Sequence, residues 1–164
     1  MAFKEKYSVE EWKKLQYALL WVFDAVAGAD NKIDKKEQKA LGKIVDNSGK
    51  FFNDLARELF MEVKDNFDQF HNEFEKLGVK EEQGLKEVAI LLKGRVLDET
   101  ALNYKKTLIA IGVLIGHSSG SLFGSKLSDE EVAQVKRVGE LLEVSVGDLE
   151  KSPNLQQIIQ SLNV

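Results

Sequence analysis

Cysteine is absent from this chain of 164 residues, which also contains only one proline, Pro153, and two histidines. The lack of cysteine excludes disulfide bonds, thiolate metal sites and a cysteine nucleophile. So few helix-breaking prolines favour long helices over many short strands. The chain also lacks an excess of basic residues, because its formal net charge is -4. This charge balance predicts that the protein does not bind nucleic acid.

Long hydrophobic runs are missing as well. The longest apolar stretch, residues 108–115, is far shorter than the roughly 20 residues that a membrane-spanning helix needs. Residues 1–14 are charged and contain no apolar segment typical of a secretory signal. We therefore expect a soluble, cytoplasmic protein without a membrane span. A hydrophobic content of 43% is typical of a globular chain and favours a single domain over residues 1–164.

Apolar residues recur at three- and four-residue steps along most of the chain, which is the spacing of amphipathic helices. Capping boxes, in which a Ser or Asp precedes a Glu by three residues, open predicted helices at Ser8, Asp34 and Ser128. From residue 50 to residue 78 the spacing continues without a break. It predicts one long helix, or two nearly collinear helices with a bend near Asp65 and Asn66.

The C-terminal part carries two further signals of helix starts. Ser145 is predicted to cap a short turn, and Pro153 is predicted to occupy the first position of the last helix. Together these segments predict an all-α protein, a single-domain bundle of about seven to eight helices.

The sequence also contains an internal pseudo-repeat. Aligning Tyr17 with Tyr104 places the apolar residues 20–29 on residues 107–116, and residues 32–37 on residues 126–131. Both copies then consist of an apolar helix, a turn and a capped second helix, and the second turn is longer by about seven residues. We expect two pseudo-repeated helical hairpins whose apolar leading helices pack against each other at the centre of the bundle.

Acidic side chains gather at the first of these turns, where Asp24, Asp30, Asp34 and Glu37 are the candidate metal ligands. Their oxygen atoms suit Ca²⁺ or Mg²⁺. The turn does not match an EF-hand loop, because the sixth position counted from Asp30 is a lysine and the twelfth is a leucine. We therefore expect weak cation binding, with a dissociation constant on the order of 10⁻⁴ to 10⁻³ M. In the alternative interpretation, Asp34 and Glu37 only cap the helix that follows.

Residues 116–120 read Gly-His-Ser-Ser-Gly and match the nucleophile-elbow pattern G-x-S-x-G, which makes Ser118 a candidate nucleophile. The context argues against a hydrolase, because the triad histidine follows the serine in such enzymes, whereas His71 precedes Ser118. No alternation of strands and helices surrounds the motif either. We therefore predict that the protein is not an enzyme.

A loop rich in serine and glycine, residues 117–127, carries the apolar residues Leu122 and Phe123. Such residues either fold back onto the core or contact a partner protein. His117, at the start of this loop, is a candidate pH-sensitive group at a helix C-terminus. The loop supports an alternative function, that of a metal-independent adaptor for protein partners.

Residues 29–37 read Ala-Asp-Asn-Lys-Ile-Asp-Lys-Lys-Glu after an apolar helix. This resembles the motif of the TerB-like family of bacterial tellurite-resistance proteins, which is Ala-Asp-Gly, a variable residue, an aliphatic residue, Asp or Ser, two variable residues and Glu. Asn31 replaces the glycine, and His117 stands at the place of the turn aspartate in the second copy. The likeness spans residues 8–146. It implies a compact helical fold, a cation site at the acidic residues, and a part in stress-response complexes with protein partners.

Overall fold

The structure is a computed structural model that describes residues 2–28, 35–118 and 129–162, and every regular element in these ranges is a helix. The α-helices are α1 (Val9–Ala27), α2 (Lys35–Asp46), α3 (Asp54–Asp65), α4 (Phe67–Leu77), α5 (Glu81–Leu92), α6 (Asp98–Ser118), α7 (Asp129–Leu141), α8 (Val146–Glu150) and α9 (Leu155–Leu162). Two short 3₁₀ helices, η1 (Phe3–Lys6) and η2 (Ser48–Lys50), precede α1 and α3. The predicted all-α helical bundle is confirmed. Among the described residues, no helix has the length and apolar character that crossing a membrane requires.

Local capping signals set where several helices begin. The Ser8 hydroxyl accepts a hydrogen bond from the backbone N–H of Glu11 (3.1 Å), and the Glu11 carboxylate accepts one from the N–H of Ser8 (2.9 Å). Ser145 opens α8 with the same reciprocal arrangement, as predicted. The predicted start of the last helix at Pro153 is wrong, because α9 begins at Leu155. Asn154 caps α9 instead, because its side-chain oxygen accepts a hydrogen bond from the backbone N–H of Gln157 (2.9 Å).

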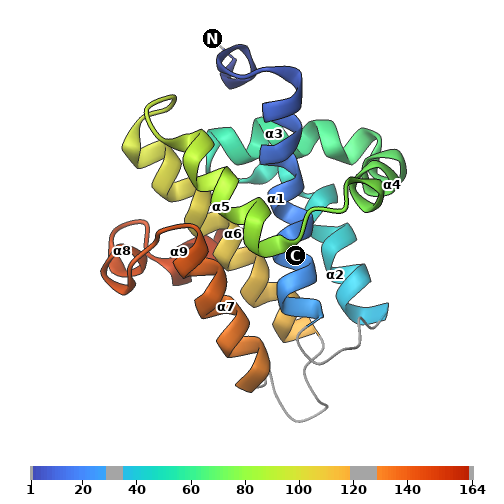
Figure 1. Cartoon of the computed structure of the whole chain (residues 1–164). Helices are drawn as coiled ribbons and strands as arrows, with labels where there is room; N and C mark the ends of the chain where they lie inside the picture. The colour runs from blue at the N-terminus through green and yellow to red at the C-terminus, as the bar shows by residue number, and fades with distance from the viewer. Residues whose placement is uncertain (1, 29–34, 119–128, 163–164) are drawn as a thin grey trace.

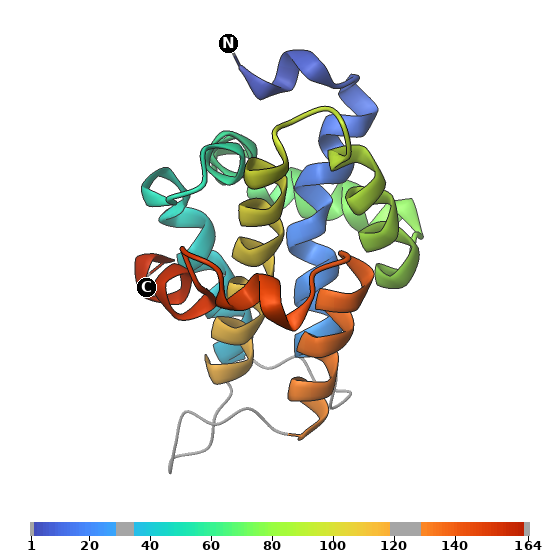
Figure 2. The same cartoon turned by 90° about the vertical axis from the view of Figure 1, so that its left-hand side faces the viewer.

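The chain bends at Asn66, where the backbone leaves the helical region (φ -137°, ψ 41°) and separates α3 from α4. The position of the bend is as predicted, but the two helices are not collinear, since α4 leaves in a different direction from α3 (Figures 1 and 2). Aromatic packing explains this direction. Phe70 and Phe74 of α4 lie 5.1 and 5.5 Å from Tyr17 of α1, measured between ring centroids.

The apolar helices α1 and α6 lie side by side at the centre of the bundle (Figures 1 and 2). The Tyr104 hydroxyl of α6 donates a hydrogen bond to the backbone carbonyl of Leu15 in α1 (2.7 Å). Further along, Gly112 allows a close approach, because a Cβ there would lie 3.2 Å from Cγ1 of Val22. The two leading helices of the pseudo-repeat therefore form the shared centre, as predicted.

The second helices of the two hairpins cross over to the other half. In the described residues α2 packs on α6 and α3, whereas α7 packs on α1, α6 and α5. Equivalent positions of the pseudo-repeat are also buried to a similar extent. Glu37 and Glu131, which the alignment pairs, are only 1% and 5% exposed. The described helices of the two halves are therefore interleaved.

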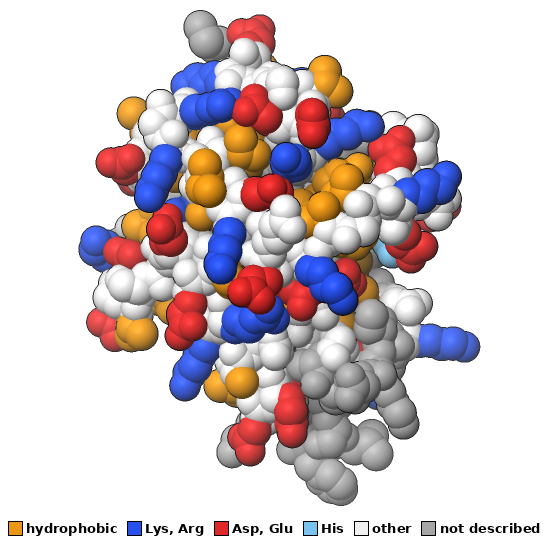
Figure 3. Space-filling view, viewed as in Figure 1, with side chains coloured by type: hydrophobic (Ala, Val, Ile, Leu, Met, Phe, Trp, Pro, Cys, Tyr) orange, Lys and Arg blue, Asp and Glu red, His pale blue; other side chains and the backbone are white. Residues whose placement is uncertain are grey.

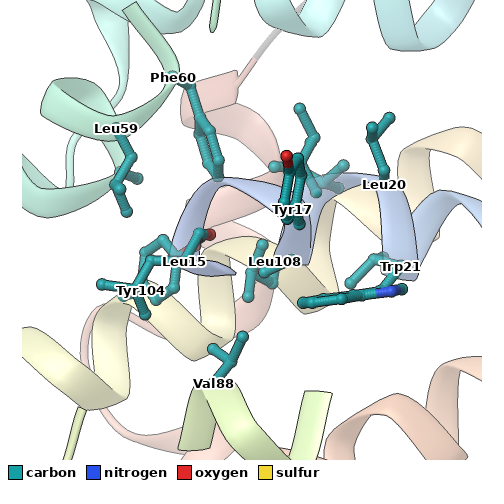
Figure 4. Packing of buried hydrophobic residues seen from close by; sticks show 14 of the residues in the cluster. Leu15, Tyr17, Leu20, Trp21, Leu59, Phe60, Val88, Tyr104 and Leu108 are labelled. Carbon is teal, nitrogen blue, oxygen red and sulfur yellow. Dashed lines mark hydrogen bonds between the residues drawn. The ribbon is translucent and has the colours of Figure 1, made fainter. Parts of the chain in front are cut away.

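The core fills the space between α1, α3, α5 and α6 (Figure 4). Trp21 of α1, Phe60 of α3, Val88 of α5 and Leu108 of α6 converge there, and each is almost fully buried. The segment between α8 and α9 is held against α6 by a buried lysine: Lys106 donates from Nζ to the carbonyl oxygens of Lys151 and Pro153, both at 3.1 Å. These bonds satisfy a cation that would otherwise be costly to bury.

Candidate functional site

Four helix ends meet at the end of the bundle opposite the N-terminus. The C-terminal ends of α1 and α6 and the N-terminal ends of α2 and α7 all lie there (Figures 1 and 2). The described candidate residues of both halves, Asp24 and Glu37 of the first and His117 of the second, therefore lie at this end of the molecule. Residues 29–34 and 119–128 of the two predicted turns lie outside the described residues.

The structure describes two of the four predicted metal ligands. Asp24 lies in the last turn of α1, and Glu37 lies in the first turn of α2. Asp30 and Asp34 lie outside the described residues. Within the described residues, no group of three or more His, Cys, Asp or Glu side chains is arranged to hold a metal ion.

Asp24 faces an open groove of about 650 Å³ between α1, α2 and α4, which we call the Asp24 groove. Its walls carry two more carboxylates, Asp68 and Glu75, and the imidazole of His71. His71 Nδ1 lies 3.5 Å from the Glu75 carboxylate, one helical turn away on α4. The groove therefore collects acidic side chains from two helices, with a single histidine among them.

The pKa of Asp24 is raised from its ordinary 3.8 to about 6. Asp24 is an exposed residue at the rim of the groove, and the largest cause is the partial removal of its carboxylate from water, which disfavours the charged form. The negative charges of Glu81 and Glu75 raise the pKa further, and His71 partly offsets them. The α1 C-terminus adds the negative end of a helix dipole. This corner therefore has a local excess of negative potential.

Glu37 is in a different situation, because its side chain is buried at the start of α2 and is engaged in an interaction within the protein. Its counterpart in the second half, Glu131, is likewise buried and engaged. Buried carboxylates of this kind need partners for their oxygen atoms. The shared position favours a structural role for both glutamates at their helix starts, the alternative that the sequence left open.

A second groove, of about 310 Å³, lies on another side of α2, between this helix and α6, and we call it the lysine groove. Its lining residues are Lys36, Lys39, Ala40, Lys43 and Ile44 of α2 with Leu114 and His117 of α6. The three lysine side chains are exposed, whereas Ile44 is only 1% exposed. The groove therefore combines cationic groups with an apolar floor.

Many cationic side chains elsewhere on the surface are paired with carboxylates. Lys4, Lys13 and Arg95 each lie within 3.0 Å of a glutamate oxygen. On the face seen in Figure 1, cationic and anionic side chains are interspersed (Figure 3). In the lysine groove, by contrast, no described carboxylate lies within 4.0 Å of the three ammonium groups. This row of cations is available to an anionic partner.

His117 lines the lysine groove at the C-terminal end of α6. Its Nδ1 atom is buried and has no hydrogen-bond partner among the described residues. Ser118, the candidate nucleophile, is the last residue of α6. The elbow context requires a strand before the serine, whereas a long α-helix precedes Ser118. The rest of the predicted contact loop, including Leu122 and Phe123, lies outside the described residues.

The sequence pattern alone did not predict the lysine groove. The signal was present in part, because Lys36, Lys39 and Lys43 recur at steps of three and four and so share one side of α2. The opposite wall comes from α6, more than 70 residues later in the chain, and local spacing does not reveal it. The acidic neighbours of Asp24 on α4 were overlooked for the same reason.

No protein-family model, no curated protein and no solved structure matches this chain. The TerB-like resemblance of residues 29–37 stays a prediction from the motif.

Proposed function

We propose that this protein is a non-enzymatic helical module of the TerB-like kind, which acts through protein contacts in a bacterial stress response such as tellurite resistance. The module holds a divalent cation, Ca²⁺ or Mg²⁺, weakly at the acidic turn between α1 and α2. Asp30 and Asp34 are its main proposed ligands and Asp24 adds a third carboxylate, whereas Glu37 has the structural role at the start of α2 described above.

The observation that carries this proposal is the gathering of carboxylates at the end of α1, where Asp24 faces a groove that Asp68 and Glu75 also line. The pKa of Asp24 rises to about 6, first because its carboxylate is partly removed from water and secondly because the negative charge of Glu81 adds to the local potential. A cation near the C-terminus of α1 would offset this potential and the helix dipole together. Asp30 comes three residues after the end of α1 in the sequence, which is why we propose it as a ligand together with Asp24.

The chemistry of the candidate ligands favours a hard cation and weak binding. Carboxylate oxygens suit Ca²⁺ and Mg²⁺, which bind oxygen ligands almost exclusively. Lys32, Lys35 and Lys36 surround the same turn in the sequence and oppose the charge of the ion. A dissociation constant on the order of 10⁻⁴ to 10⁻³ M follows from this balance.

A titration with CaCl₂ and MgCl₂, followed by amide chemical shifts in a ¹H–¹⁵N correlation spectrum, tests the cation site. We expect saturable shifts centred on residues 29–37, and we expect them to disappear in a variant that combines Asp30→Asn with Asp34→Asn. A matched variant, Asp54→Asn with Asp65→Asn at the ends of α3, should leave the shifts unchanged. No response at about 10 mM cation would contradict the site, since binding of the proposed strength would then be nearly saturated.

The alternative function is a metal-independent adaptor, and the lysine groove favours it, because this groove lies where the 117–127 loop leaves α6. Capture of partners by the immobilised full chain from a bacterial lysate separates the two functions. If the adaptor is correct, Leu122→Ser combined with Phe123→Ser abolishes capture, and a chelator has no effect. If the cation organises the contact surface, the chelator abolishes capture as well.

A further inference from the structure

We propose that the lysine groove binds an acidic, amphipathic helical segment of a partner protein. Carboxylates of that segment would pair with Lys36, Lys39 and Lys43, and its small aliphatic side chains would contact the apolar floor. This inference rests on the proposed function as an interaction module and names the class of partner that one of its surfaces takes.

The row of cations has the geometry of a helix face. The three lysines lie at positions i, i+3 and i+7 of α2, so they extend over about 10 Å along the helix axis. A second helix that runs antiparallel to α2 presents matching carboxylates at positions j, j+4 and j+7. No described carboxylate of this chain lies within 4.0 Å of these lysines, so a partner does not have to break existing ion pairs.

The floor explains why the segment should be amphipathic as well as acidic. Ala40 and Leu114 are half-buried, and Ile44 is almost fully buried beneath them. The small side chain of Ala40 leaves room between the α2 lysines and the α6 wall. Burial of aliphatic side chains there would add affinity that charge alone does not supply, because exposed ion pairs contribute little.

Other polyanions fit this surface less well. A nucleic acid or an anionic membrane extends beyond the groove and meets the rest of the surface, where the net charge of -4 repels it. The Asp24 groove, with Asp68 and Glu75, lies on another side of the same helix. The floor is also recessed, so no large apolar side chain projects from it into a lipid layer. A short acidic segment needs only the groove itself.

Fluorescence anisotropy with the full chain and a designed peptide tests the proposal. The probe is a fluorescein-labelled helical peptide of about 14 residues, with Glu at positions j, j+4 and j+7 and Ala and Leu on the adjoining face. A scrambled peptide of the same composition, in which the glutamates surround the helix, is its control. We expect the designed peptide to bind at least about tenfold more tightly than the scrambled one, with an affinity that falls as NaCl is raised.

Charge reversal in the groove provides the matched pair of protein variants. Lys39→Glu combined with Lys43→Glu should weaken binding at least about tenfold. Lys35→Glu combined with Lys50→Glu makes the same change in net charge at exposed residues that do not line the groove, and it should change the affinity less than about threefold. Ala40→Gln, which fills the floor without changing charge, should weaken binding to a similar extent as the charge reversal in the groove.

Equal affinities for the two peptides, equal effects of the two double variants, or no binding at about 1 mM protein would overturn the proposal. Tighter binding of a DNA duplex or of phosphatidylserine vesicles through the same lysines would also overturn it and assign another class of ligand. These outcomes test binding at the lysine groove and do not by themselves decide whether the protein is an interaction module. If the peptide does not bind at the groove but Leu122→Ser with Phe123→Ser still abolishes partner capture, the protein contacts its partners through the 117–127 loop. If neither the peptide nor a partner binds, the proposed function as an interaction module is contradicted.

Discussion

Gly84 of α5 lies directly against the indole ring of Trp21 in α1, so that a Cβ atom at residue 84 would lie 2.3 Å from Cε2 of the ring. Trp21 also donates from Nε1 to the carbonyl oxygen of Val79 in the turn before α5 (3.1 Å). The buried indole therefore positions α5 against α1 through both its face and its edge, and only glycine fits at residue 84.

Gly84→Ala is expected to destabilise the protein by about 1–3 kcal/mol. The added methyl group overlaps a buried ring that its hydrogen bond and its neighbours hold in place, and overpacking of this kind costs such amounts. Urea denaturation measures the loss. Gly42→Ala in α2 is the control, because nothing lies within 4 Å of a Cβ there, and it should stabilise the protein by about 0.5–1 kcal/mol through helix propensity. An unchanged midpoint for Gly84→Ala would show that α5 can shift away from α1.

Tyr104→Phe is expected to destabilise the protein by about 1 kcal/mol, because it removes the buried hydrogen bond from the Tyr104 hydroxyl to the Leu15 carbonyl. Tyr17→Phe is its counterpart in the pseudo-repeat. It should have a much smaller effect, since the Tyr17 hydroxyl has no hydrogen-bond partner among the described residues. Thermal unfolding of both variants compares the two positions, and equal losses would contradict the assignment of a structural bond to Tyr104.

Asp24→Asn is expected to raise stability above pH 6. The folded state raises the pKa of Asp24 from 3.8 to about 6, so the ionised carboxylate destabilises the native protein at neutral pH. This cost decreases as the pH falls through 6 and is absent below about 3.8. The gain at pH 7.5 should be about 1 kcal/mol or less, because solvent screens this partly exposed group. Thermal melts with EDTA at pH 7.5 and 3.5 measure it; a loss of stability at pH 7.5 would contradict the prediction.

Glu11→Gln is expected to show the opposite pH dependence. Hydrogen bonds from Arg95, and secondly from the backbone N–H of Ser8, lower the pKa of Glu11 from 4.5 to about 2. Its ionised form therefore stabilises the native state above pH 4.5, and this contribution is lost as the pH falls towards 2. Glutamine retains the capping geometry and removes only the charge. The variant should melt below the wild type at pH 7 and together with it near pH 2; a constant difference would indicate lost capping instead.

Interactions within a few residues were accessible from the sequence. The capping boxes at Ser8 and Ser145 follow from side chains three residues apart. The apolar spacing continues through residues 50–78, so it predicted either one long helix or two with a bend near Asn66, and the structure has the bend. The start of α9 was misjudged at Pro153, because Asn154 and Gln157 supplied a competing cap. The acidic turn was also visible as a pattern, but its ligand geometry depends on Asp30 and Asp34, which the structure does not describe.

The sequence by itself determined that this protein is helical, that Ser8 and Ser145 cap helix starts, and that two apolar helices form its centre, because caps and apolar spacing act over one or two turns. Only the tertiary structure decided that α2 packs on α6 and α7 on α1, that burial and glutamates from other helices raise the pKa of Asp24, and that three lysines face His117 across a groove. These features join residues tens of positions apart, and they arise from burial and charge in the folded chain, which local periodicity does not encode.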